Sequence, residues 1–253
     1  MLRIYWNELK KLKRQKMTRT LFMMGFLMPA FCTVLCVHNN FPFRNLVGLN
    51  ELFGSFLVVP FLFSVQLLSL FTQEEQNHTL KNLLVIGISK NKIFVSKLLV
   101  AVTVVLAFVL IETGYSMLGG FFLRGYHVDF IMVFGKLLVT SLVAVCGTMP
   151  VVVLIVLLQK KNLIAMIAVN SFIIMDFLLV WQLSMFNCLN LHFPVLVAYR
   201  ITYPFSIFDY TENLQLGIDT LYYPATQGLL ILSLTVIVSL VAGIRIFTRR
   251  REL

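Results

Sequence analysis

Long apolar runs separated by short polar connections dominate this sequence. A helix that crosses the hydrocarbon core of a bilayer needs about 20 mainly apolar residues. Stretches of about this length predict six transmembrane helices, at residues 20–37, 51–71, 98–123, 131–158, 163–186 and 225–247. No glycine- or serine-rich linker divides them. The pattern therefore predicts an all-α integral membrane protein in which residues 1–253 form a single transmembrane domain.

Residues 1–17 have a pattern of their own, with apolar and aromatic side chains at helical spacing and basic side chains mostly on the opposite face. The apolar stripe consists of Leu2, Tyr5, Trp6, Leu9 and Leu12. A basic amphipathic helix with Trp and Tyr on its apolar face lies in the plane of the membrane interface. We therefore expect residues 1–17 to form an interfacial helix.

A polar segment, FTQEEQNHTLKNLLVIGISKNKIFVSK at residues 71–97, separates the second and third predicted spans. Thr72 and Glu75 have the spacing of a capping box and predict that a helix begins there. Gly87 predicts the end of this helix, and Ser89 predicts the start of the next one. The short helix carries an apolar patch made of Leu80, Leu83 and Leu84. Such a patch suits a groove on a cytoplasmic partner or, alternatively, the lipid surface.

The composition excludes a soluble protein. Hydrophobic residues make up 59% of the chain and charged residues 13%, whereas soluble domains have about 45–50% and about 25%. A chain of this length cannot hide so much apolar surface in one soluble core.

The four cysteines form no metal or disulfide framework, and we interpret Cys32 and Cys36, one helical turn apart, as small apolar residues of a helix face.

The net charge of +10 would suggest a nucleic-acid partner in a soluble protein, but its distribution indicates membrane topology. If six spans alternate, seventeen of the 21 lysines and arginines fall on one side, in the N-terminal arm, the two connections on that side and the C-terminus. Cytoplasmic loops carry the excess of basic residues. Both termini are therefore predicted to be cytoplasmic, with the basic residues facing anionic lipid headgroups and no nucleic acid required.

Two carboxylates lie inside predicted spans. Glu112 and Asp176 are each near the middle of a span, where a charge costs about 2.5–3.5 kcal/mol on insertion scales. Each is therefore expected to face the interior of the bundle. They are either a polar site along a substrate or proton path, or hydrogen-bonded acids that hold helices together.

The outer connection between the fifth and sixth spans, residues 187–224, contains an apolar and aromatic run too short to cross a bilayer. This run is expected to re-enter the membrane or to lie in the outer interface. Three acidic residues follow it: Asp209, Glu212 and Asp219. They would suit a cationic peptide at the outer face, or they belong to an ordinary solvated loop.

The segment that begins at Glu74 resembles the coupling-helix region of permease subunits of the type-2 ABC exporter family. The family form runs from Glu through a small or polar residue with Thr, Leu and Leu to Pro-x-Ser-Arg and Ser-Lys. Matching positions here are Glu74 or Glu75, Thr79, Leu80, Leu83, Leu84, Ser89, Ser96 and Lys97. Gly87 stands near the family proline, and Lys90 replaces the commoner arginine.

The resemblance extends to the plan of the chain and is closest to small permease subunits of lantibiotic immunity exporters. It implies a bacterial cell-membrane exporter in which two copies of a separate ATPase bind ATP and Mg, beside a second identical or related permease. It implies an antimicrobial peptide as substrate, and a coupling helix within residues 72–90. The ATPase-coupling residues would be Glu74, Glu75, Thr79, Leu80, Leu83, Leu84, Ser89 and Lys90. In an ATP-driven exporter, the helix-holding interpretation of Glu112 and Asp176 is favoured.

Motifs for nucleotide binding and catalysis do not occur in the sequence. It has no G-x-x-x-x-G-K-[ST], G-x-S-x-G or H-E-x-x-H, so neither ATP binding nor hydrolase or metalloprotease chemistry is supported. We predict no catalytic residue, no bound cofactor and no metal site in this chain.

Two alternatives to a peptide-exporting permease remain. One is a type-2 permease for another amphipathic peptide, drug or lipid-linked compound, and the other is a membrane-embedded substrate-binding subunit of an uptake system.

Overall fold

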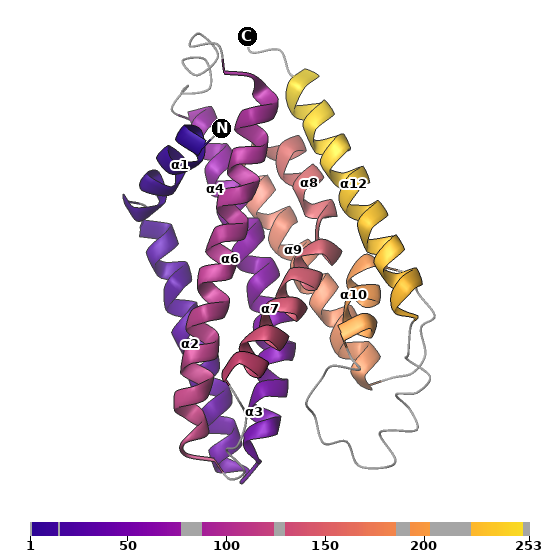
Figure 1. The fold of residues 1–253 in the computed structure, drawn as a ribbon. Helices are drawn as coiled ribbons and strands as arrows, with labels where there is room; N and C mark the ends of the chain where they lie inside the picture. The colour runs from indigo at the N-terminus through magenta and orange to yellow at the C-terminus, as the bar shows by residue number, and fades with distance from the viewer. Residues whose placement is uncertain are drawn as a thin grey trace.

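The structure is a computed structural model that describes residues 2–14, 16–76, 88–123, 130–185, 193–202 and 224–249. Its helices pack side by side into one elongated bundle (Figure 1). In chain order they are α1 (Leu2–Arg14), α2 (Lys16–His38), α3 (Phe43–Leu49), η1 (Asn50–Val58), α4 (Val59–Gln76), α6 (Lys90–Gly120), α7 (Phe130–Gly147), α8 (Pro150–Leu158), α9 (Asn162–Met185), α10 (Pro194–Thr202) and α12 (Ala225–Arg249).

Five helices in the described part of the chain are long and apolar enough to cross a membrane. They are Phe43–Glu74, Lys90–Gly120, Phe130–Gly147, Asn162–Trp181 and Ala225–Arg249. The helix expected to be the first span, α2, has 23 residues, and its described apolar stretch is the shorter Phe26–His38. The all-helical membrane architecture is thus confirmed, whereas a count of six spans stays a prediction that rests on α2.

The second span is longer than predicted, because α3, η1 and α4 follow one another without a break from Phe43 to Gln76. The middle part, η1, is π-helical: the backbone N–H of Val59 donates to the carbonyl of Gly54, five residues back. Pro60 follows directly and has no N–H to donate to the carbonyl four residues before it. A wider turn just ahead of a proline is one way to accommodate that missing bond.

The predicted capping box at Thr72 is wrong. Thr72 lies inside α4, and its hydroxyl donates back to the carbonyl oxygens of Leu68 at 2.9 Å and Ser69 at 3.3 Å. The hydroxyl therefore satisfies a bond within the helix and begins no new one. The prediction for Ser89 is confirmed, because Ser89 is the extended residue before α6, although its side chain makes no cap hydrogen bond. The short helix expected between them lies outside the described residues.

The predicted fourth span, residues 131–158, is divided into α7 and α8. Thr148 and Met149 form a turn between them, and Pro150 is the first residue of α8. Proline is well suited to this first position, where its missing N–H would have no helical partner. α10 packs beside this break, and the Cα of its Val195 would lie only 2.9 Å from a Cβ built on Gly147. Gly147 therefore allows α7 and α10 to approach backbone to backbone.

Candidate functional site

A cluster of buried charges lies where α1, α4 and α6 meet. Lys97 is completely buried, and its ammonium nitrogen lies 3.1 Å from Glu74 Oε1 on α4 and 3.8 Å from Glu8 Oε2 on α1. It also donates a hydrogen bond to the backbone carbonyl of Leu70. Lys97 is thus enclosed by protein. We call Glu8, Glu74 and Lys97 the charge cluster.

The N-terminal helix α1 is packed against the bundle. Its Tyr5 hydroxyl is hydrogen-bonded to Thr103 Oγ1 of α6 at 2.7 Å, and its Leu12 is buried in a cluster with Leu70, Val100 and Val104. Part of the apolar stripe of α1, which was expected to lie in the membrane interface, thus packs against α4 and α6. Trp6 points outward and is 60% exposed, as an interfacial tryptophan would be.

An aromatic cluster lies beside the charge cluster and joins α4, α6 and α12. The ring centroids of Phe71, Phe94 and Phe247 are 5.5–5.9 Å apart, in tilted and edge-to-face arrangements. Such geometries are favourable for aromatic pairs. Lys97 Nζ also lies 5.4 Å from the centroid of the Phe71 ring, so the two clusters are in contact.

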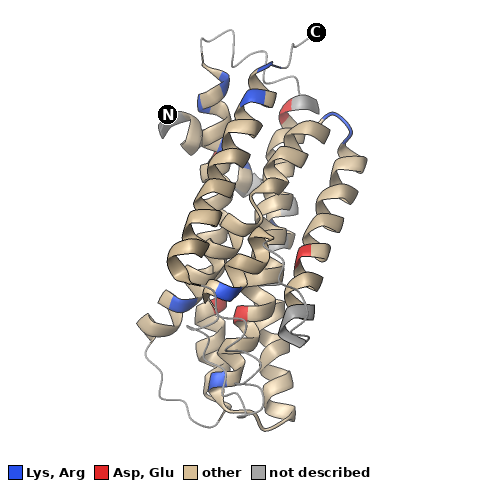
Figure 2. Ribbon diagram, turned by 90° about the vertical axis from the view of Figure 1, so that its right-hand side faces the viewer, with Lys and Arg blue, Asp and Glu red and all other residues tan. Residues whose placement is uncertain are grey.

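Most lysines and arginines that the structure describes gather toward the end of the bundle where α1 begins and α12 ends (Figures 1 and 2). The described part of the connection between α4 and α6 also lies at this end, with α4 ending at Gln76 and α6 beginning at Lys90. This grouping agrees with the charge asymmetry along the sequence. It places both ends of the polar segment at the basic end of the bundle.

A polar seam crosses the bundle interior between η1 and its neighbours α6 and α7. Asn50 Nδ2 donates to Ser116 Oγ at 2.6 Å, and the Ser55 hydroxyl is paired with Thr140 and Ser141 at 3.2 and 2.9 Å. Hydrogen bonds between helices replace the hydrophobic driving force that membrane helices lack among themselves. The seam therefore fixes the π-helical segment against two spans.

Glu112 lies within this seam and is fully buried, which confirms that it faces the bundle interior. Its carboxylate lies against the backbone of Gly54 in η1: a Cβ built on Gly54 would be 1.6 Å from Glu112 Oε1. Neither carboxylate oxygen has a hydrogen-bond partner among the described residues. Asp176 on α9 is buried as well, and Oδ2 of its carboxylate has no partner there. No described contact brings the two carboxylates together.

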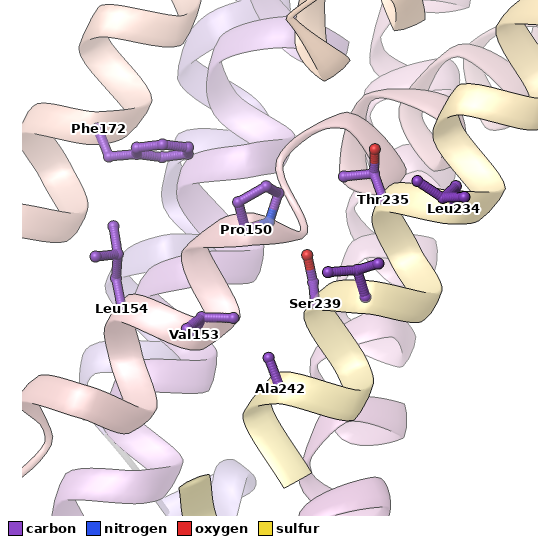
Figure 3. Close-up of a pocket in the computed structure, with 9 residues that line it drawn as sticks. Pro150, Val153, Leu154, Phe172, Leu234, Thr235, Ser239 and Ala242 are labelled. Carbon is purple, nitrogen blue, oxygen red and sulfur yellow. The ribbon is translucent and has the colours of Figure 1, made fainter. Parts of the chain in front are cut away.

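An apolar groove of about 710 Å³ runs between α8 and α12, with Phe172 of α9 at one side (Figure 3). Its lining residues are Pro150, Val153, Leu154, Phe172, Leu234, Thr235, Val238, Ser239 and Ala242. Thr235 Oγ1 is occupied by a hydrogen bond to the carbonyl of Ile231 at 2.8 Å. The groove begins at the proline break between α7 and α8, and its character suits an acyl chain or an apolar side chain.

Several residues predicted to couple to an ATPase or to face a substrate lie outside the described residues. These are Thr79, Leu80, Leu83, Leu84, Asp209, Glu212 and Asp219, together with the side chain of Glu75. Their roles stay predictions. Among the others, Glu74 is buried in the charge cluster, Ser89 precedes α6 and Lys90 is its first residue. The pattern of the sequence pointed to Glu74 and Lys97 separately but gave no sign that they pair with Glu8.

Within the part of the chain that the structure describes, no group of three or more His, Cys, Asp or Glu side chains could hold a metal ion. Cys32 and Cys36 are fully buried in the apolar core, in agreement with their interpretation as small apolar residues.

The fold defines a multi-pass, all-helical membrane protein with a basic end. The family model described as "ABC-2 family transporter protein" matches residues 4–177, more than half of the sequence, and the chain belongs to this family. No curated protein matches the chain. It is thus the membrane component of an ABC transporter, a class of proteins that works with an ATPase partner.

Proposed function

We propose that this chain is the permease subunit of an ABC exporter that expels an amphipathic antimicrobial peptide from a bacterial cell membrane. The observation that carries the proposal is the family match. The arrangement of α4 and α6 agrees with it, because the end of α4 and the start of α6 flank residues 77–89 at the basic end of the bundle. The narrower resemblance to small immunity permeases, which rests on the size of the chain and on its NELKKLKRQK start at residues 7–16, supports the peptide substrate.

The basic end of the bundle faces the cytoplasm in this proposal, because basic residues are enriched on the cytoplasmic side of membrane proteins. Residues 77–87 then lie on the side of the membrane where ATP is available. A separate ATPase, in two copies, binds ATP and Mg and docks there through the patch of Leu80, Leu83 and Leu84. A second permease, identical or related, completes the transporter.

The substrate proposal rests on charge and on apolar surface. Asp209, Glu212 and Asp219 would attract the cationic side chains of a peptide at the outer face. The apolar groove between α8 and α12 is large enough for several apolar side chains and is open along the membrane-spanning part of the bundle. An amphipathic cationic peptide presents both kinds of surface. A drug or a lipid-linked compound is the alternative cargo, because the groove alone would suit either.

The surroundings of Glu112 favour a structural role for this residue over a position on the substrate path. Its carboxylate is closed off from solvent by η1 and α6 of the same subunit, so a substrate could reach it only after the helices separate. A protonated carboxyl that packs helices together needs no such opening. The other candidate class, a substrate-binding subunit of an uptake system, receives no support from the family match.

Transport of a labelled peptide tests the proposed export. Inside-out vesicles that contain this chain and its cognate ATPase should accumulate a fluorescent cationic lantibiotic when ATP is added, at least about tenfold above vesicles without ATP. A hydrolysis-deficient ATPase variant is the matched control and should reduce accumulation to the level without ATP. Accumulation of an uncharged drug in place of the peptide would contradict the substrate proposal while leaving the permease intact.

A further inference from the structure

The charge cluster is closed by residues from three helices that are far apart in the sequence. Lys97 of α6 is fully buried and contacts Glu74 of α4, Glu8 of α1 and the carbonyl oxygen of Leu70. Glu8 and Glu74 are themselves buried. Interactions between buried charges are weakly screened by water and salt, so the electrostatic attraction within this network is stronger than in an exposed ion pair, while the loss of hydration of the charges opposes it.

The charges of the cluster are balanced both with α1 and without it. Two carboxylates, Glu8 and Glu74, face the one buried ammonium of Lys97, and Lys11 of α1 supplies a second ammonium through its ion pair with Glu8. Removing α1 from the bundle would therefore remove one carboxylate and one ammonium together. Changing Glu74 or Lys97 to a neutral residue instead leaves an uncompensated charge away from water, which is strongly unfavourable, whereas changing Glu8 leaves the pair of Glu74 and Lys97.

The position of the cluster relates α1 to the proposed coupling segment. Glu74 is in the last turn of α4, which ends at Gln76, and Lys97 is in the second turn of α6, after its start at Lys90. Their ion pair thus joins the helix that leads into residues 77–87 to the helix that leads out of them. Glu8 attaches α1 to the same ammonium group.

We propose that Lys97 is a positioning residue that makes α1 move together with the two ends of the coupling segment when the ATPase changes its nucleotide state. This inference rests on the proposed function of residues 77–87 as the ATPase docking segment. α1 is then a mechanical part of the transporter, and Glu8 is the residue through which it receives the motion. The outer face of α1, which is aromatic and basic, carries that motion to the membrane surface.

Spin-label distances in the complete transporter test this proposal. The four native cysteines are replaced by alanine, and labels are placed at exposed positions: Trp6 on α1, Leu99 on α6 and Val241 on α12. The distance from Trp6 to Val241 reports α1, and the distance from Leu99 to Val241 reports α6. Each is measured without nucleotide and with ATP on a hydrolysis-deficient ATPase.

The proposal predicts that both distances shift with ATP in the parent protein. Glu8→Gln should reduce the α1 shift to less than half and preserve the α6 shift, because it removes the charge of α1 from Lys97 and leaves the pair with Glu74. Lys97→Arg keeps the charge and should preserve both shifts. Tyr5→Phe is the matched control, since it removes the hydrogen bond between α1 and Thr103 without changing a charge, and it too should preserve both shifts.

The two proposals fail in different ways. An α1 shift that is unchanged in Glu8→Gln, or equally reduced in Tyr5→Phe, would overturn the role of the charge cluster and leave the proposed function standing. Failure of the parent chain to retain an ATPase, or the absence of any α6 shift, would overturn the proposed function and this inference with it. A merely structural role of Glu8 predicts a lower unfolding temperature with an α1 shift that persists.

Discussion

Replacing Gly147 by valine is expected to destabilise the protein by about 2–3 kcal/mol, near the upper end of the usual cost of overpacking a core. A Cβ at this position would lie 2.9 Å from the Cα of Val195, and 3.1 Å from both the carbonyl oxygen of Pro194 and the Cβ of Ala198. These atoms belong to the backbone or are fixed to it, so no side-chain rotation relieves the clash. α10 would have to move away from α7. A denaturant titration in mixed micelles measures the change in the free energy of unfolding.

The matched control for this prediction is Gly135→Val in the same helix. Apart from its chain neighbours and the adjacent backbone of its own helix, no described atom lies within 4 Å of a Cβ built on Gly135, and glycine is itself unfavourable inside a helix. We expect this variant to change stability by less than about 0.5 kcal/mol, as is usual for substitutions at the surface. Equal effects of the two substitutions would show that helix propensity, and not the approach of α10, governs Gly147.

Phe94→Ala is expected to destabilise the protein by about 3 kcal/mol and to loosen α12 from the rest of the bundle. Phe94 is buried and contacts both Phe71 and Phe247, so its removal leaves a cavity among three helices. The cost lies at the low end of the range for such substitutions, because in a bilayer the alternative surroundings are lipid and not water. Denaturant titration measures the loss. The accessibility of a cysteine introduced by Ser239→Cys, at a buried position of α12 outside the aromatic cluster, measures the loosening of α12.

Leu99→Ala is the control for Phe94→Ala. Leu99 lies in the same helix but is 45% exposed on the outside of the bundle, where lipid fills the space of the removed atoms. We expect a change of less than about 0.5 kcal/mol, because this substitution opens no cavity inside the bundle. A loss for Leu99→Ala as large as that for Phe94→Ala would contradict the view that the aromatic cluster holds α12.

Hydropathy located the membrane helices well wherever one continuous apolar run makes a whole span. The predicted spans at residues 163–186 and 225–247 agree closely with α9 and α12. The second span was predicted too short, because Asn50 is polar and was placed outside it, and the predicted span began only at Glu51. Both are buried in the structure, and Asn50 is hydrogen-bonded to Ser116. A pattern along one helix does not reveal a partner on another.

The error at Thr72 has a similar origin. A threonine three residues before a glutamate is a capping box only if the chain has left the preceding helix. Here α4 continues, and the Thr72 hydroxyl bonds to the carbonyl of Leu68. The pairing of Glu74 with Lys97 depends on how α4 and α6 pack against each other, which no local pattern specifies. The π-helical turn of η1 and the approach at Gly147 also arise from packing between helices.

Retention of an ATPase by this chain tests the central claim most directly. The claim is that residues 77–87 form the docking site through which ATP hydrolysis drives the membrane helices. Affinity purification of the chain from membranes that contain the cognate ATPase should retain the ATPase in stoichiometric amount. Leu83→Asp should lower that amount at least about tenfold by placing a charge in the apolar patch. Asn162→Asp also adds one negative charge, at the exposed start of α9, and should retain the ATPase. Unchanged retention by Leu83→Asp would contradict the account.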